Sequence, residues 1–174
     1  FLHRHDPPIL HRDVKPQNLK LMTDGQVVLL DFGLSKGAAG EMSRTVNDES
    51  ISGFTPSYAS PEQMRDEGTT VASDLFSLGA TLYHLMTGVK PIDAVTRTLK
   101  ARPPEPDPVA RVDALNDSVP AAVADVIECA MQLEPGSRYA SANEMREALS
   151  AALPDPSELV RALGEVLAQI PEPS

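Results

Sequence analysis

The apolar positions of this chain change their spacing once, from short strand-like runs near the N-terminus to helical repeats over most of the rest. Residues 19–22 and 27–30 are two apolar runs separated by Thr23-Asp24-Gly25-Gln26. This arrangement predicts a β-hairpin with Asp-Gly at its turn. Residues 34–57 follow no period and are rich in Gly, Ser, Thr, Asn and Asp, which predicts a long functional loop.

Helical spacing begins after this loop. Pro61 is expected to start a short helix that reaches about Glu67. A longer helix is predicted next, with Ser73 as its N-cap and Gly88 at its end. Its apolar residues extend beyond one stripe, so we expect it to be buried on nearly all sides. Further helices are predicted around residues 93–100, 119–131, 141–153 and 159–170.

Composition narrows the class of protein. The chain has 174 residues, enough for one domain, and a net charge of −10, which argues against nucleic acid or an anionic membrane as a partner. One cysteine excludes a disulfide framework and a four-cysteine zinc site. No apolar run approaches the ~20 residues that span a bilayer, and no secretory segment opens the chain, so we expect a cytoplasmic location. Because residue 1 is Phe, the sequence is expected to be part of a longer chain.

The most specific pattern is a polar motif just before the predicted hairpin. It reads His11-Arg12-Asp13-Val14-Lys15-Pro16-Gln17-Asn18, and Asp31-Phe32-Gly33 follows thirteen residues after Asn18. The pair resembles the protein kinase family, specifically the H-R-D-x-K-P-x-N catalytic loop of serine/threonine kinases and the D-F-G metal motif. Two segments, residues 73–80 and 52–56, are most similar to bacterial members of that family.

The resemblance implies a separate role for each of these residues in phosphoryl transfer, a reaction whose catalysis depends mostly on positioning and charge neutralisation. Asp13 would accept the proton of the substrate hydroxyl, and Lys15 would lie against the γ-phosphate of ATP. Asn18 and Asp31 would offer oxygen ligands to Mg²⁺, a hard cation that prefers oxygen donors. His11 and Phe32 would be structural, packed in the hydrophobic column that joins the two lobes.

Residues further along the chain fit the same family. Residues 55–62 resemble the T-P-x-Y-x-[AS]-P-E segment that ends the activation loop, and Thr55 would hydrogen-bond the catalytic Asp and Lys and help form the substrate pocket. Glu62 and Arg138 match a buried ion pair of the family. Asp74 matches the aspartate that holds the catalytic-loop backbone. These last three residues are predicted to be scaffold.

Regulation by phosphorylation is also implied. Arg12 precedes the catalytic aspartate, and a phosphate on the activation loop could pair with it and order the loop. Thr45, beside Arg44, is the favoured phosphorylation site; the other candidates are Ser43, Ser50 and Ser52. His3 and His5 lack further ligands nearby, so we read them as residues of a solvated loop.

The expected fold is mainly α with a short β-hairpin, the large C-terminal lobe of a two-lobed α+β protein kinase. Residues 1–153 would form this lobe and residues 154–174 a proline-flanked tail helix. The glycine-rich loop, strand lysine and helix glutamate of the small lobe are not among the ten residues before His11, so that lobe is expected upstream. Lys20 stands where the family usually has an apolar residue beneath adenine.

The predicted function is a serine/threonine protein kinase that uses ATP and Mg²⁺ to phosphorylate Ser/Thr hydroxyls of proteins, with this chain alone inactive. A free-standing binding or scaffold module without phosphotransfer is the alternative. Its weakness is that a scaffold has no need of the full set Asp13, Lys15, Asn18 and Asp31. A small-molecule phosphotransferase is a third hypothesis, disfavoured by residues 55–62 and Arg138, which in the family build a platform for peptide substrates.

Overall fold

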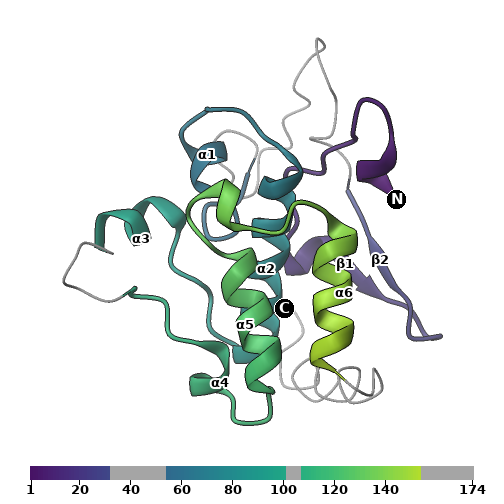
Figure 1. Ribbon diagram of the computed structural model, residues 1–174. Coiled ribbons are helices and arrows are strands. Elements are labelled where there is room, and N and C mark those ends of the chain that lie inside the picture. Colours follow the sequence, from purple (N-terminus) through teal and green to yellow (C-terminus); the bar gives the residue numbers. More distant parts are fainter. Residues whose placement is uncertain (32–53, 101–106, 154–174) are drawn as a thin grey trace, which may run out of the picture.

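One long helix, α2 (Val71–Thr87), forms the centre of the fold. The computed structural model describes residues 1–31, 54–100 and 107–153. Figure 1 shows α2 behind α5 (Ala121–Ala130), with α6 (Ala142–Ala152) beside α5. No residue of α2 is exposed, which confirms the prediction that this helix is buried on nearly all sides.

The start of α2 corrects one sequence prediction. Ser73 is not the N-cap: the cap is Thr70, one turn earlier, and Ser73 occupies the third helical position. Ser73 Oγ accepts the Thr70 N–H at 3.0 Å, so its hydroxyl reaches back to the cap from inside the helix. The predicted end is confirmed, because Gly88 adopts the left-handed conformation that stops the helix, with φ 70°.

Close packing between α2 and α5 depends on a glycine. A Cβ added at Gly79 would lie 2.9 Å from Ala130 Cβ and 3.1 Å from Met131 Cγ. Ala80 and Val123 are completely buried at the same interface. The absence of a side chain at Gly79 therefore allows α5 to approach α2 closely.

The predicted hairpin is confirmed. Strands β1 (Leu19–Leu21) and β2 (Val27–Leu29) pair antiparallel with Lys20 opposite Val28, and Gly25 provides the positive φ of the turn, 83°. The hairpin directly follows the short 3-10 helix η2 (Pro16–Asn18) and lies at the side of the helical body (Figure 1).

Short helices complete the described part of the chain. They are η1 (Leu2–Arg4), α1 (Pro61–Met64), α3 (Ala94–Lys100), α4 (Val112–Leu115) and η4 (Pro135–Ser137). Helix α1 ends before Glu67, α3 matches its prediction, and α4 was not predicted. The residues described here contain no helix long and apolar enough to cross a membrane.

Several predictions fall outside the described residues: most of the loop at 34–57, including Thr45, together with Phe32 and the tail helix at 159–170. The predicted fold class is confirmed within the described ranges, which are rich in helix and contain one two-stranded hairpin.

Candidate active site

Four polar side chains from two distant segments meet beside the hairpin. Lys15 Nζ lies 2.9 Å from Asp13 Oδ2 and donates to Thr55 Oγ1 at 3.0 Å. Thr55 Oγ1 donates to Asp13 Oδ1 at 3.2 Å, which closes the triangle of Asp13, Lys15 and Thr55. Asn18 Nδ2 donates to Asp13 O at 2.8 Å and faces Asp13 Oδ2 at 3.3 Å. The structure therefore brings these four predicted site residues together around one carboxylate.

The loop that carries Asp13 is hydrogen-bonded to Asp74, a residue in the first turn of α2. Asp74 Oδ2 accepts the N–H of His11 and Asp74 Oδ1 accepts the N–H of Arg12, both at 2.8 Å. Asp74 is almost fully buried, so these two backbone bonds also satisfy its carboxylate. Arg12 adopts a left-handed conformation, with φ 70°, which the paired bonds help to hold.

His3 is a third partner of Asp74, and the prediction that it lies in a solvated loop is wrong. Its Nε2 lies 2.9 Å from Asp74 Oδ2, and the side chain is mostly buried. Sequence patterns contain no local signal for this contact, because it joins residues 71 positions apart through the path of the N-terminal segment.

The end of the hairpin is tied to the same loop. His11 is buried and its Nε2 bonds Leu30 O at 2.9 Å, while the Leu30 N–H donates to Asn18 O at 2.7 Å. Asp31, the next residue, is exposed and adopts a positive φ of 61°. These bonds fix the start of the D-F-G motif relative to Asn18.

The donor set at this place fits Mg²⁺ held together with a phosphate group. Because Asn18 uses its Nδ2 toward Asp13, its Oδ1 is left without a hydrogen-bond partner among the described residues. Asp31 supplies an exposed carboxylate. Protein sites for Mg²⁺ commonly use one or two oxygen side chains and leave the other positions to water and phosphate oxygens. No group of three or more His, Cys, Asp or Glu side chains able to hold a metal occurs among residues 1–31, 54–100 and 107–153.

A buried ion pair anchors the segment that carries Thr55. Arg138 donates to both carboxylate oxygens of Glu62, at 2.7 and 2.9 Å, and its guanidinium lies 4.9 Å from the centre of the Phe76 ring. Ser73 Oγ adds a third bond to Glu62 at 2.7 Å. Burial alone would raise the pKa of Glu62, but the bonds from Arg138 and Ser73 outweigh it and hold that pKa at about 2.

Tyr58 secures the same segment to α2. Its hydroxyl lies 2.6 Å from Nδ1 of His84, and the two rings stack with centroids 6.0 Å apart. Burial raises the pKa of Tyr58 to about 12, and burial together with the nearby Lys90 lowers the pKa of His84. The uncharged Tyr58–His84 pair is therefore the stable form at neutral pH.

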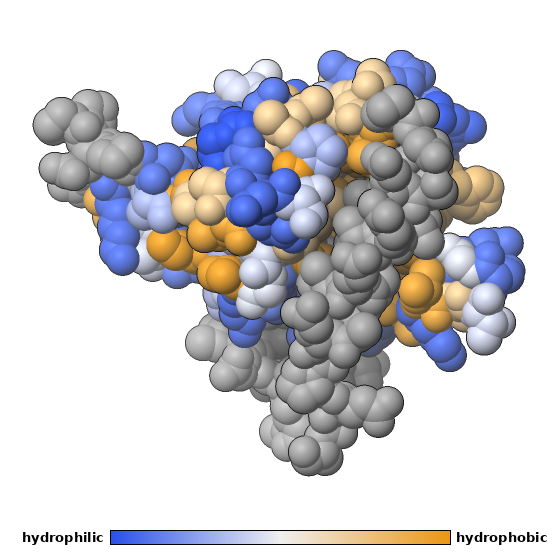
Figure 2. Space-filling model, turned by 90° about the horizontal axis from the view of Figure 1, so that it is seen from below, coloured by the Kyte–Doolittle hydropathy of each residue, from blue (hydrophilic) through white to orange (hydrophobic). Residues whose placement is uncertain are grey.

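The hairpin presents apolar side chains to the surroundings. Leu21, Met22, Val27, Val28 and Leu30 are all more than a third exposed, and Lys20 is exposed among them. Figure 2 shows orange side chains on the hairpin, which projects from the body at the right of that view. Exposed apolar side chains therefore gather on this part of the described chain.

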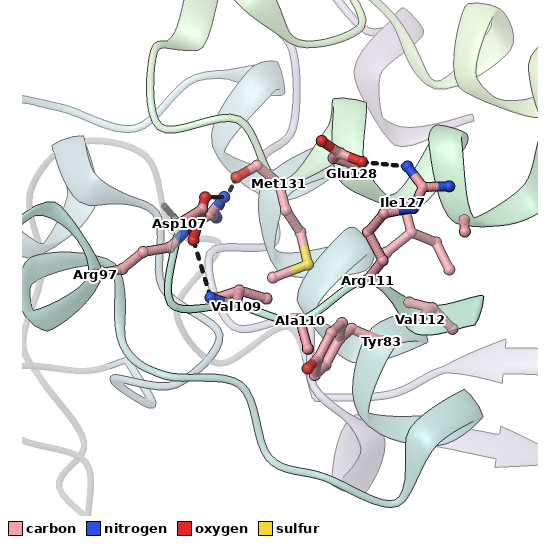
Figure 3. A pocket seen from close by; sticks show the side chains of 11 residues that line it. Tyr83, Arg97, Asp107, Val109, Ala110, Arg111, Val112, Ile127, Glu128 and Met131 are labelled. Carbon is pink, nitrogen blue, oxygen red and sulfur yellow. Dashed lines mark hydrogen bonds and ion pairs between the residues drawn. The ribbon is translucent and has the colours of Figure 1, made fainter. Parts of the chain in front are cut away.

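A separate small pocket lies between α3 and α5. Its volume is about 60 Å³, and Figure 3 shows Arg97 with Asp107 at one end and Arg111 with Glu128 at the other. Arg97 is buried, donates its Nε to Asp107 at 2.9 Å and also reaches the carbonyl of Met131. Neither Asp13 nor its partners line this pocket, and Arg97 links α3 to the C-terminal end of α5 through the Met131 carbonyl.

The helical body and the site at its edge define the large lobe of the protein kinase class. The family described as protein kinase domain matches residues 1–150, and the chain belongs to this family. Among curated relatives, the chain is 35% identical over 147 residues to the serine/threonine-protein kinase PknL of Mycobacterium tuberculosis, a match that covers 84% of this chain and 36% of that protein. A probable serine/threonine-protein kinase of Clostridium perfringens, CPE1738, is 35% identical over 156 residues, which cover 88% of this chain and 22% of that protein.

Solved structures agree with the fold. The apo form of PpkA-294 superposes with a TM-score of 0.62 at 26% identity, over 85% of this chain and 49% of that one. The Mycobacterium tuberculosis PknI kinase domain gives a TM-score of 0.55 at 25% identity, over 83% of this chain and 46% of that one. The chain therefore spans about half of these kinase structures and less than half of the curated relatives.

Proposed function

We propose that these residues form the large lobe of a serine/threonine protein kinase, which transfers the γ-phosphate of ATP to Ser/Thr hydroxyls of proteins. The observation that carries the proposal is the convergence of Lys15, Asn18 and Thr55 on the carboxylate of Asp13. The names of the relatives support a serine/threonine kinase of the bacterial type.

In this proposal each side chain has one task. Asp13 accepts the proton of the attacking hydroxyl, and Thr55 restrains the carboxylate on its other oxygen and borders the peptide acceptor. Lys15 places its ammonium beside the same carboxylate, where it faces the transferred phosphoryl group. Asn18 and Asp31 hold Mg²⁺, which when bound neutralises charge on the phosphate oxygens.

The second lobe belongs to the proposal as well. The groups that grip the α- and β-phosphates in protein kinases do not occur among the ten residues before His11. The exposed apolar side chains of the hairpin offer the surface on which a nucleotide-binding lobe would rest. The proposal therefore expects the coding sequence upstream of Phe1 to contain a glycine-rich strand–loop and a strand lysine. A start codon directly before Phe1 would instead favour the scaffold hypothesis.

Asp13→Asn in the full-length protein encoded by the gene tests the chemistry. Loss of the base is expected to lower the rate of phosphate transfer from ATP–Mg²⁺ to a Ser/Thr protein substrate by about 10²–10⁴-fold. The measurement is incorporation of labelled γ-phosphate. Asp117→Asn, the same change at an exposed position outside the site, should leave the rate unchanged. Undiminished transfer by Asp13→Asn would refute the role given to Asp13.

A further inference from the structure

A glutamine side chain from α1 reaches the backbone of the loop that carries Asp13. Gln63 Nε2 donates to Arg12 O at 2.6 Å, although these residues are 51 positions apart in the chain. The accepting carbonyl belongs to the peptide unit that joins Arg12 to Asp13. The glutamine thus holds the last peptide before the Asp13 carboxylate.

This peptide unit follows a residue with a left-handed backbone conformation. Arg12 has a φ of 70°, a left-handed conformation that a residue with a side chain rarely adopts. The Arg12 N–H is held by Asp74 at 2.8 Å, and the Asp13 N–H faces His11 Nδ1 at 3.4 Å. Gln63 donates a hydrogen bond to the Arg12 carbonyl, so this turn is restrained by Asp74 of α2 and by Gln63 of α1.

The base of the glutamine side chain is itself fixed. The Gln63 N–H donates to Oγ of Ser60, the N-cap of α1, at 3.3 Å. The preceding residue, Glu62, is held by the bidentate ion pair with Arg138. The side chain therefore leaves a rigid turn, and its direction toward Arg12 is set by packing and capping together.

The other end of the amide shows why a glutamine is unusual here. Gln63 Oε1 is buried and has no hydrogen-bond partner within the described ranges. A buried acceptor without a partner destabilises a fold, and an apolar side chain of the same length would avoid that cost. A reversed amide is no remedy, because it would set Oε1 against the Arg12 oxygen. The donor function of Nε2 is what an amide adds at this position.

We propose that Gln63 is a positioning residue, which fixes the Arg12–Asp13 peptide from the end of the activation segment and thereby orients the Asp13 carboxylate. Its effect on catalysis rests on the function proposed above, whereas its effect on the loop does not. The side chain acts through Arg12 O and need not touch substrate or nucleotide.

Gln63→Met in the 174-residue chain tests the proposal. Methionine keeps the length, removes the donor and removes the orphaned oxygen, so the melting temperature should stay the same or rise. Hydrogen exchange at the amides of Arg12 and Asp13, followed by NMR, should accelerate by roughly tenfold, the effect of one lost hydrogen bond. Gln132→Met is the matched control, because Gln132 Nε2 donates to the carbonyl of Glu128 at 3.3 Å within α5 and its partner lies outside the site loop.

Two outcomes would overturn the proposal: unchanged exchange at Arg12 and Asp13, or faster exchange throughout the chain with a lower melting temperature, which would indicate a purely structural role. Gln63→Glu, which keeps the shape but turns an acceptor toward Arg12 O, provides a second variant with the same expected local effect. In the full-length protein, Gln63→Met should lower kcat with little change in KM for ATP. If the wild-type protein transfers no phosphate, the proposed function fails, and the exchange experiment still decides the role of Gln63.

Discussion

Asp74 and Glu62 are buried carboxylates that stabilise the site in different ways. Asp74 receives backbone N–H groups, so it fixes the course of the loop. Glu62 receives a guanidinium and a hydroxyl, so it fixes one segment against another. Both contacts lie away from the Asp13 carboxylate. Their loss should therefore act on stability and geometry before it acts on any chemical step.

Glu62→Gln is expected to lower the free energy of unfolding by about 3 kcal/mol at pH 7, because Arg138 would remain buried without a countercharge. The pKa of Glu62 is lowered in the folded protein, so its stabilising effect is complete above the ordinary pKa of 4.5 and is lost as pH falls toward about 2. The difference between variant and wild type should shrink over that range. Urea denaturation at pH 7 and pH 3 measures it.

Glu67→Gln is the control for this experiment. Glu67 is exposed and lies 3.7 Å from Arg65, a surface pair whose loss should change stability by less than about 1 kcal/mol. An equal effect of both substitutions would contradict the role assigned to the buried pair.

At the scale of single residues, the resemblance to protein kinases identified Asp74, Glu62 and Arg138, because each lies in or near a segment that matches the family. His3 and Gln63 were missed for the opposite reason. Each contacts a partner that is more than 50 positions away in the sequence, and the residues next to it form no pattern from which the contact could be predicted.

Among the elements, α2 was the easiest to predict as a whole, although the residue that caps its first turn was predicted wrongly. A run of apolar residues that ends at Gly88 defines a helix by periodicity alone. Its beginning depends on whether Thr70 or Ser73 caps, and both are good capping residues. The choice is settled by tertiary structure, since Ser73 Oγ also donates to Glu62.

Gly79→Ala tests how tightly α2 and α5 are packed. Alanine favours a helix over glycine by about 1 kcal/mol, but its Cβ would fall 2.9 Å from Ala130 Cβ, and overpacking of this kind typically costs about 1–3 kcal/mol. We expect a net loss of about 1 kcal/mol in thermal or urea unfolding. Gly136→Ala, where an added Cβ meets nothing within 4 Å, should lack this loss. A stabilised Gly79→Ala would mean that the two helices separate at little cost.

For the molecule as a whole, charge and the range of residues present bear on how tightly the 174-residue chain would bind a nucleotide. The sequence carries a net charge of −10, which repels a polyphosphate. Under the proposed function Lys15, Asn18 and Asp31 would face the phosphates, whereas the groups that grip the α- and β-phosphates in protein kinases do not occur among the ten residues before His11. The helical body and the hairpin could be predicted from the spacing of apolar residues. The position of the candidate site beside the hairpin could be predicted from the motif at residues 11–18 and its resemblance to protein kinases.

Calorimetry with ATP and Mg²⁺ should accordingly give weak or no binding to the 174-residue chain, with a Kd above about 1 mM. The full-length protein encoded by the gene is the positive control and should bind more tightly. Micromolar binding by the 174-residue chain would show that this lobe holds nucleotide without help from another one.

The two strands of the hairpin have a consequence for solubility. Among the described residues the sheet has only two strands, so each strand has one edge without a paired strand, and both strands carry exposed apolar side chains such as Leu21 and Val27. Such edges are templates for sheet extension between molecules and hence for aggregation. Lys20 places an exposed charge in the middle of β1, opposite Val28. An exposed charge within an edge strand is a feature that opposes edge-to-edge association in proteins, so Lys20→Val is expected to make the hairpin more prone to aggregation.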